Sequence, residues 1–137
     1  MVSAVLHNSY SIPKRLDWRE YGFITPPVNQ RDCGSCYAYS IAESIQGQIF
    51  KQTGMLLPLS AQQLVDCSTA TGNRGCVGGS LRNTLKYLEK SKGLMTGYLY
   101  PYNAEVRIAL FPPVEYIRLE YSVGAPCIKY STRMTLA

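Results

Sequence analysis

Cys36 is the side chain in this sequence whose setting most favours nucleophilic chemistry. It lies one residue inside the start of a predicted helix, directly after the loop segment 30–35. A thiolate at that point faces unpaired backbone N–H groups and the positive end of the helix macrodipole, and both stabilise the charged, nucleophilic form. The same N–H groups, together with the side-chain amide of Gln30, can hold a developing oxyanion. The spacing therefore predicts two parts of an acyl-transfer site, an activated nucleophile and a place for negative charge.

The cysteines allow other interpretations on the residues alone. The chain contains five of them: Cys33, Cys36, Cys67, Cys76 and Cys127. An odd number leaves at least one thiol free if the others form bridges within the chain. Cys33-x-x-Cys36 has the spacing of a redox pair, but the prolines before it argue against the strand that such a motif needs. A zinc site would need a closer second pair than Cys67 and Cys76, and all five could instead be structural cysteines of a small disulfide-bonded domain.

Three helices are predicted to position these residues. Apolar residues of the segment 35–51 share one helical face: Ala38, Ile41, Ala42, Ile45 and Ile49. Gly54 should end this first helix. A capping box at Ser60 predicts a second helix that reaches about Cys67, with Gln63 bonding back to the cap. The chain is therefore predicted to be mainly helical around Cys36.

A glycine-rich loop over residues 71–79 separates the second helix from the third. Ser80 is predicted to cap the third helix, Lys92 to lie in its last turn and Gly93 to end it. Four residues of this helix are predicted to share one face: Leu81, Thr84, Leu85 and Leu88.

The two ends of the chain have a different character. Residues 1–11 are predicted to form an irregular arm or to be a propeptide remnant, and the segment 17–28 a short strand or an extended wall. The segment 104–137 contains no Asp, Asn, Gln, His or Trp. Alternation over 117–123 predicts at most one strand in this divergent tail.

Composition excludes several classes of protein. With 137 residues, of which 46% are hydrophobic and 17% charged, the chain can bury one core. The net charge of +5 is scattered, with no basic run longer than Lys14-Arg15, which argues against a nucleic-acid binder. No stretch is long and apolar enough for a membrane span or a signal-peptide core.

Five segments together resemble the papain-like cysteine proteases of the cathepsin L type. They are Ile12-Pro13 with Asp17-Trp18-Arg19, Asn29-Gln30-x-x-Cys33-Gly34-Ser35-Cys36-Tyr37-Ala38-Tyr39-Ser40, Leu59-Ser60-x-Gln62-Gln63-Leu64-Val65-Asp66-Cys67, Gly75-Cys76-x-Gly78-Gly79, and Tyr100-Pro101-Tyr102. The resemblance covers about residues 12–103. It implies an α+β family fold, of which this chain carries mainly the α-helical (left) domain over 12–103, without the β-rich domain.

The resemblance implies roles for individual residues. Cys36 would attack a peptide carbonyl and form a thioester, with Gln30 and the backbone N–H of Cys36 as the oxyanion hole. Gly34, Gly78 and Gly79 would face an extended peptide, with Ser80 and Leu81 beside it. Cys33–Cys76 would be a disulfide, and Cys67 would pair with Cys127. No cofactor or metal is implied.

Two departures from the family pattern limit the expected activity. The family's catalytic His and Asn lie on the β-rich domain, and the single histidine here, His7, matches neither and is expected in the solvated arm. Tyr37 stands where the family usually has Trp. We therefore expect a cysteine-type peptidase by family that is incomplete and inactive as it stands. The alternative is a non-catalytic peptide- or inhibitor-binding fragment.

The expected partners follow from the same resemblance. They are a peptide or protein substrate and cystatin-like or propeptide inhibitors, with a lysosomal or secreted location.

Overall fold

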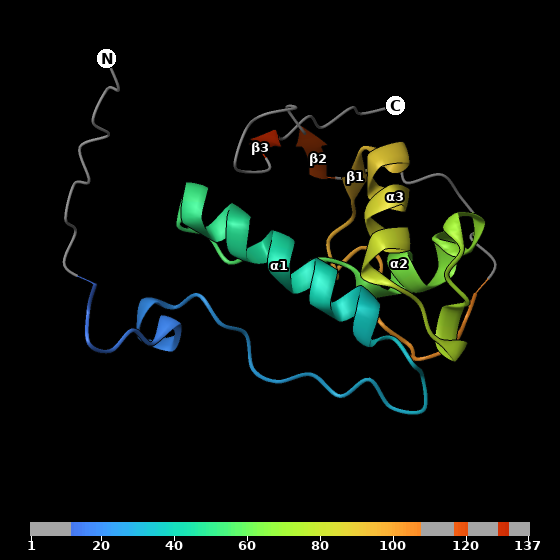
Figure 1. The fold of residues 1–137 in the computed structure, drawn as a ribbon, viewed down its shortest axis with the longest axis horizontal. Coiled ribbons are helices and arrows are strands. Elements are labelled where there is room, and N and C mark those ends of the chain that lie inside the picture. The colour runs from blue at the N-terminus through green and yellow to red at the C-terminus, as the bar shows by residue number, and fades with distance from the viewer. Residues whose placement is uncertain (1–11, 108–116, 121–128, 132–137) are drawn as a thin grey trace, which may run out of the picture.

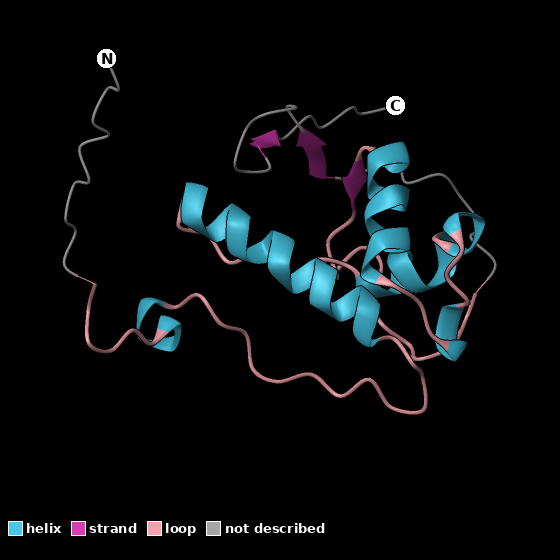
Figure 2. Ribbon diagram, in the orientation of Figure 1, coloured by secondary structure: helices cyan, strands magenta, loops and turns pink. Residues whose placement is uncertain are grey.

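Three α-helices form the framework of the computed structural model, which describes residues 12–107, 117–120 and 129–131 (Figures 1 and 2). The helices are α1 (Cys36–Thr53), α2 (Ala61–Cys67) and α3 (Leu81–Ser91). Three short 3-10 turns and three strands accompany them: η1 (Trp18–Tyr21), η2 (Thr69–Thr71), η3 (Gly75–Val77), β1 (Gly93–Leu94), β2 (Ile117–Glu120) and β3 (Lys129–Ser131).

The long helix α1 is the centre of the described fold, and its predicted apolar face is confirmed. All five residues of that face are buried. They form one core with side chains from α2, α3 and β1, including Leu64, Val65, Leu88 and Leu94. Gly54 caps the helix as predicted. Since α1 contacts α2, α3 and β3, its first residue, Cys36, is carried by a helix that is anchored in the core.

The second helix keeps half of its predicted capping box. The Ser60 hydroxyl accepts a hydrogen bond from the Gln63 backbone N–H at 3.0 Å. The predicted return bond from the Ser60 N–H to the Gln63 side chain is wrong, because the Ser60 N–H donates to the Met95 carbonyl. The Gln63 side chain accepts from the Met95 N–H at 2.7 Å instead. The glutamine thus ties α2 to the chain after β1.

The third helix starts as predicted but ends differently. Ser80 caps it by accepting from the Asn83 N–H at 3.1 Å. Its C-cap is Lys92, at φ 60°, and not Gly93, which is already the first residue of β1. On the predicted apolar face only Thr84 and Leu88 are buried. Leu81 and Leu85 are 50% and 49% exposed, so the predicted apolar face is only half buried.

A small antiparallel sheet corrects the prediction of at most one strand in the tail. β2 pairs with β1, with Gly93 opposite Arg118, and β3 pairs with β2, with Arg118 opposite Ser131. The tail therefore contributes two strands. A two-residue strand such as β1 has no sequence signal of its own, and β2 finds its partners only through the fold.

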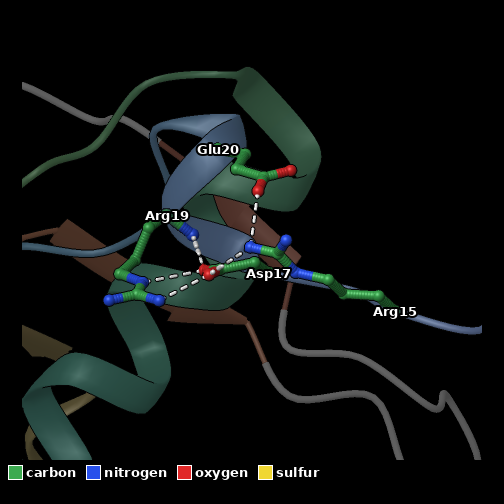
Figure 3. Close-up of polar contacts among 4 residues, drawn as sticks. All are labelled: Arg15, Asp17, Arg19 and Glu20. Carbon is green, nitrogen blue, oxygen red and sulfur yellow. Dashed lines mark hydrogen bonds and ion pairs between the residues drawn. The ribbon is translucent and has the colours of Figure 1, made fainter.

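The N-terminal segment is extended apart from one turn, and Figure 1 shows it in blue beside α1. The predicted wall is interrupted by η1, which Asp17 caps by accepting from the Arg19 N–H at 3.1 Å. Arg19 and Arg15 converge on Asp17, and Arg15 also pairs with Glu20 (Figure 3). The hydrogen bond from the Arg19 side chain lowers the pKa of Asp17. These ion pairs are solvent-exposed and order the turn more than they stabilise the fold.

Candidate active site

Cys36 is an exposed free thiol at the first position of α1. The residue before it, Ser35, is the N-cap and makes no side-chain capping hydrogen bond to the helix. The N-caps of α2 and α3, Ser60 and Ser80, do make such bonds. The Ala38 and Tyr39 N–H groups donate to the Ser35 carbonyl, whereas the N–H groups of Cys36 and Tyr37 have no acceptor among the described residues and are available to a negative charge.

The loop that carries Gln30 is fastened to the start of α1 by a tyrosine. The Tyr102 hydroxyl donates to the Gln30 carbonyl at 2.7 Å. The same hydroxyl oxygen lies 2.6 Å from the Ser35 hydroxyl. Gln30 and Ser35 are thus each one hydrogen bond away from the same oxygen atom. Within the described ranges the side-chain amide of Gln30 has no hydrogen-bond partner, so it is available to a ligand.

A disulfide joins this loop to the glycine-rich loop. Cys33 and Cys76 are bonded, as the family resemblance implied. The bridge links positions 43 residues apart, and in the chain-entropy model it stabilises the fold by about 4 kcal/mol. The Gly34 N–H donates to the Cys76 carbonyl at 2.8 Å, and a Cβ on Gly34 would lie 2.9 Å from that oxygen. Only glycine allows the two backbones to approach this closely.

The glycine-rich loop is held from behind by Asn73, which is buried. Its side-chain oxygen accepts from the Ser80 N–H at 2.9 Å, and its nitrogen donates to Ser68 and Thr84. Gly79 packs on this amide, since a Cβ there would lie 2.5 Å from Asn73 Oδ1 and 3.0 Å from Tyr37 Cδ1. The loop therefore rests directly on the first turn of α1.

Tyr37 completes the contact between helix and loop. Its ring is 3% exposed, and its hydroxyl donates to the Gly75 carbonyl at 3.0 Å. Burial raises the pKa of this phenol, so it stays a neutral donor. An indole in this position would have no hydroxyl for that bond. The tyrosine thus packs as an aromatic ring and also anchors the loop.

The backbone groups of the double glycine differ in their availability. The Gly78 carbonyl accepts from the Arg74 N–H at 2.8 Å, and its N–H donates to Gly75. Gly79 is exposed, and its N–H and carbonyl have no partner among the described residues. Ser80 and Leu81 follow at the exposed start of α3. Gly79 is thus a free backbone edge on the loop that packs against Tyr37 in the first turn of α1.

The structure gathers most of the predicted site residues around the start of α1. Cys36, Gly34 and Gln30 come from one loop and helix start, and the Cys33–Cys76 bridge brings the double glycine to them. Two residues that sequence reasoning gave no role, Tyr102 and Asn73, hold these loops. Tyr102 contacts residues 67 and 72 positions away, and no local pattern signals such a contact.

Cys67 is a different kind of thiol from Cys36. It is half-buried and free, and burial raises its pKa above the ordinary value, against hydrogen bonds with Tyr87 and Tyr100 that lower it. Because Cys67 is a free thiol in the structure, the expected bond to Cys127 is not formed there; Cys127 itself, like His7, lies outside the described residues.

The described residues hold no group of three or more His, Cys, Asp or Glu side chains able to bind a metal ion. In the same residues, no helix is long and apolar enough to cross a membrane.

The chain is similar to known proteins in both sequence and fold. The family described as "Papain family cysteine protease" matches residues 12–133, which includes most of the tail expected to be divergent. Human cathepsin L2 is 44% identical over 102 residues, which are 74% of this chain and 30% of that protein. Mouse procathepsin L is 49% identical over 94 residues, 69% of this chain and 28% of that protein. The chain thus spans less than a third of the length of these relatives.

Two solved structures agree with the described fold. The bromelain protease of Ananas comosus, solved with the E64 inhibitor, superposes with a TM-score of 0.64 at 34% identity, covering 71% of this chain and 44% of the other. The proform of the ragweed cysteine protease Amb a 11 gives a TM-score of 0.72 at 31% identity, covering 83% and 35%.

Proposed function

The chain belongs to the papain family of cysteine proteases, and on this basis we propose that Cys36 is the nucleophile of acyl transfer from peptide substrates. The Cys36 sulfur attacks the carbonyl carbon, and the carbonyl oxygen becomes an oxyanion. The C–N bond then breaks, which leaves a thioester on Cys36 and an amine that must take up a proton. The described part of the chain is the mainly α-helical part of this fold.

One observation carries the proposal. The exposed thiol lies at the first position of a helix whose N-cap serine does not cap it. That leaves N–H donors where both the thiolate and the oxyanion need them. The unpaired amide of Gln30, on a loop fastened to the same helix start, is the second proposed donor to the oxyanion.

Gly79 is the proposed docking edge for the substrate backbone. A peptide in extended conformation needs free N–H and carbonyl groups to pair with, and Gly79 offers both on the loop that packs against the first turn of α1. Gly34 and Gly78 have their own backbone bonds and are proposed to leave room for the chain of the substrate. Ser80 and Leu81 are proposed to contact its side chains.

This chain by itself is proposed to accept an acyl group but not to turn over peptides. Departure of an amine needs a proton donor, and the only histidine of the 137 residues is His7. Loss of such a group costs several powers of ten in rate. The alternative, a non-catalytic peptide- or inhibitor-binding fragment, is favoured by the same scarcity of histidine.

Partners and location are proposed from the family. Peptides or proteins are the substrates, and cystatin-like or propeptide inhibitors are candidate ligands. The disulfide Cys33–Cys76 fits a lysosomal or secreted location, because such bonds persist in oxidising compartments.

The test uses an activated substrate whose leaving group needs no proton. An N-acylated dipeptide p-nitrophenyl ester should release about one equivalent of p-nitrophenolate per chain, since deacylation lacks a base. Intact mass should rise by one acyl group, and peptide mapping should locate it on Cys36. The matching p-nitroanilide should not be turned over.

Two variants serve as controls. Cys36→Ala should abolish the burst, whereas Cys67→Ser should retain it. Peptide binding without any burst would support the binding-only alternative, and an acyl group on another residue would contradict the assigned nucleophile. Sustained Cys36-dependent turnover of the anilide would contradict the proposed incompleteness.

A further inference from the structure

The N-cap serine of α1 uses its hydroxyl differently from the other two. Ser60 and Ser80 have extended backbones, and each hydroxyl accepts from an N–H of its own helix. Ser35 has φ −96° and ψ 14°, which aims its hydroxyl elsewhere. Ser35 therefore gives up a capping bond that stabilises a helix, and its hydroxyl bonds to another partner instead.

That partner is the hydroxyl of Tyr102, and counting protons fixes the direction of the bonds. A phenol has a single proton to donate. The Tyr102 proton goes to the Gln30 carbonyl at 2.7 Å. The Ser35 hydroxyl also has a single proton and two acceptors in reach, the Tyr102 oxygen at 2.6 Å and the Cys33 carbonyl at 3.4 Å. With the Tyr102 proton on Gln30, the short Ser35–Tyr102 contact requires Ser35 to donate to the Tyr102 oxygen. The result is a directed chain from Ser35 through Tyr102 to Gln30.

The ring of Tyr102 packs against a second aromatic ring. It makes an edge contact with the ring of Tyr39, with the centroids 5.0 Å apart. Tyr39 lies on α1, so the phenol is fixed relative to the helix that carries Cys36. Its hydroxyl can therefore act as a rigid spacer between this helix and the loop of Gln30.

We propose that Tyr102 is a positioning residue of the oxyanion hole, which sets the register between Gln30 and the start of α1 through the hydrogen-bond chain Ser35–Tyr102–Gln30. The inference rests on the proposed function, because it assigns the spacing of the two oxyanion donors to this tyrosine. The contacts of Tyr102 in the described chain are with Ser35, Gln30 and Tyr39, and we assign it no contact with the substrate. Removing its hydroxyl should therefore affect only those reactions of Cys36 in which an oxygen must bind between the Gln30 amide and the Cys36 N–H.

The test compares two reactions of Cys36. A peptide aldehyde adds its carbonyl carbon to the sulfur, and the thiol proton ends on the former carbonyl oxygen, which must enter the oxyanion hole. Iodoacetamide alkylates the same sulfur with loss of iodide and needs no such hole. In Tyr102→Phe we expect aldehyde affinity to fall about tenfold, while the alkylation rate stays within about twofold, because only the former depends on donor placement.

Tyr39→Phe is the matched control. It removes a phenol hydroxyl from the other ring of the pair, one that has no hydrogen bond among the described residues. It should leave both reactions unchanged. Ser35→Ala is the second variant, because it cuts the same chain at its other end and keeps the Tyr102–Gln30 bond. It should give a smaller loss of aldehyde affinity than Tyr102→Phe, about threefold.

The outcomes separate the inference from the proposed function. Selective loss of aldehyde affinity in Tyr102→Phe and Ser35→Ala, with Tyr39→Phe unchanged, supports the inference. Wild-type aldehyde affinity in both variants overturns it and leaves the proposed function standing. If the wild-type chain itself forms no aldehyde adduct at Cys36, the proposed function fails and the inference with it. Should Tyr102→Phe not fold, Ser35→Ala alone decides between the first two outcomes.

Discussion

At the scale of single residues, two free thiols of the described chain lie in opposite environments. Cys36 is exposed at the start of α1, and Cys67 is half-buried at the end of α2. Burial stabilises the neutral thiol over the thiolate, so it raises the pKa of Cys67. Nucleophilic chemistry at neutral pH should therefore be confined to Cys36.

The first prediction is selective alkylation. At pH 7 iodoacetamide should modify Cys36 at least about tenfold faster than Cys67, because Cys67 is shielded and holds little thiolate. Raising the pH moves Cys67 toward its raised pKa and should increase its rate, so the preference should narrow toward alkaline pH. Time-resolved peptide mapping measures both rates, and Cys67→Ser checks the assignment. Equal rates at pH 7 would contradict the distinction between the two thiols.

The position of Cys36 could be predicted because its signals are local. The apolar period of residues 38–49 and the loop before them place the start of the helix without any tertiary information. Tyr102 and Asn73 could not be predicted in the same way. Their partners come from distant segments, such as Gln30 for Tyr102, and only the folded chain brings these together.

At the scale of elements, the helices were predictable and the sheet was not. Caps and periodicity lie within each helix, whereas β1 is two residues long and pairs with a strand more than twenty positions away. The C-cap of α3 shows a smaller failure of the same reasoning. Glycine is the usual residue for a left-handed C-cap, yet Lys92 adopts it and leaves Gly93 to the strand.

The second prediction concerns the docking of the glycine-rich loop on α1. In Gly79→Ala the new Cβ lies 2.5 Å from Asn73 Oδ1, closer than real Cβ contacts come, and a tight 3.0 Å from Tyr37 Cδ1. Asn73 must shift and loosen its bonds to Ser68, Thr84 and Ser80. We expect the free energy of unfolding to fall by about 1–3 kcal/mol, as urea denaturation would measure.

Gly97→Ala is the matched control for this substitution. A Cβ on Gly97 would meet only backbone atoms, the nearest at 3.7 Å, which is an ordinary contact. It should change the unfolding free energy by less than about 1 kcal/mol. Equal effects of the two substitutions would contradict the tight fit of the loop against α1.

At the scale of the whole molecule, the described chain supplies a nucleophile and a docking loop on one rigid frame. The Cys33–Cys76 bridge and the Tyr102 contact tie three loop segments to the start of α1. The family relatives are about three times as long as the matched part, since the chain covers 30% of human cathepsin L2. The site geometry therefore depends on contacts within this chain, whereas peptide turnover is proposed to need a further proton donor.

The most direct test of the account is a crystal structure of the chain with a peptide aldehyde bound. If Cys36 is the nucleophile, its sulfur should be covalently bonded to the former carbonyl carbon. The adduct oxygen should lie about 3 Å from both the Gln30 side-chain nitrogen and the Cys36 backbone nitrogen, with the peptide paired to Gly79. An adduct oxygen that points into solvent, away from Gln30, or an aldehyde bound at another residue, would contradict it.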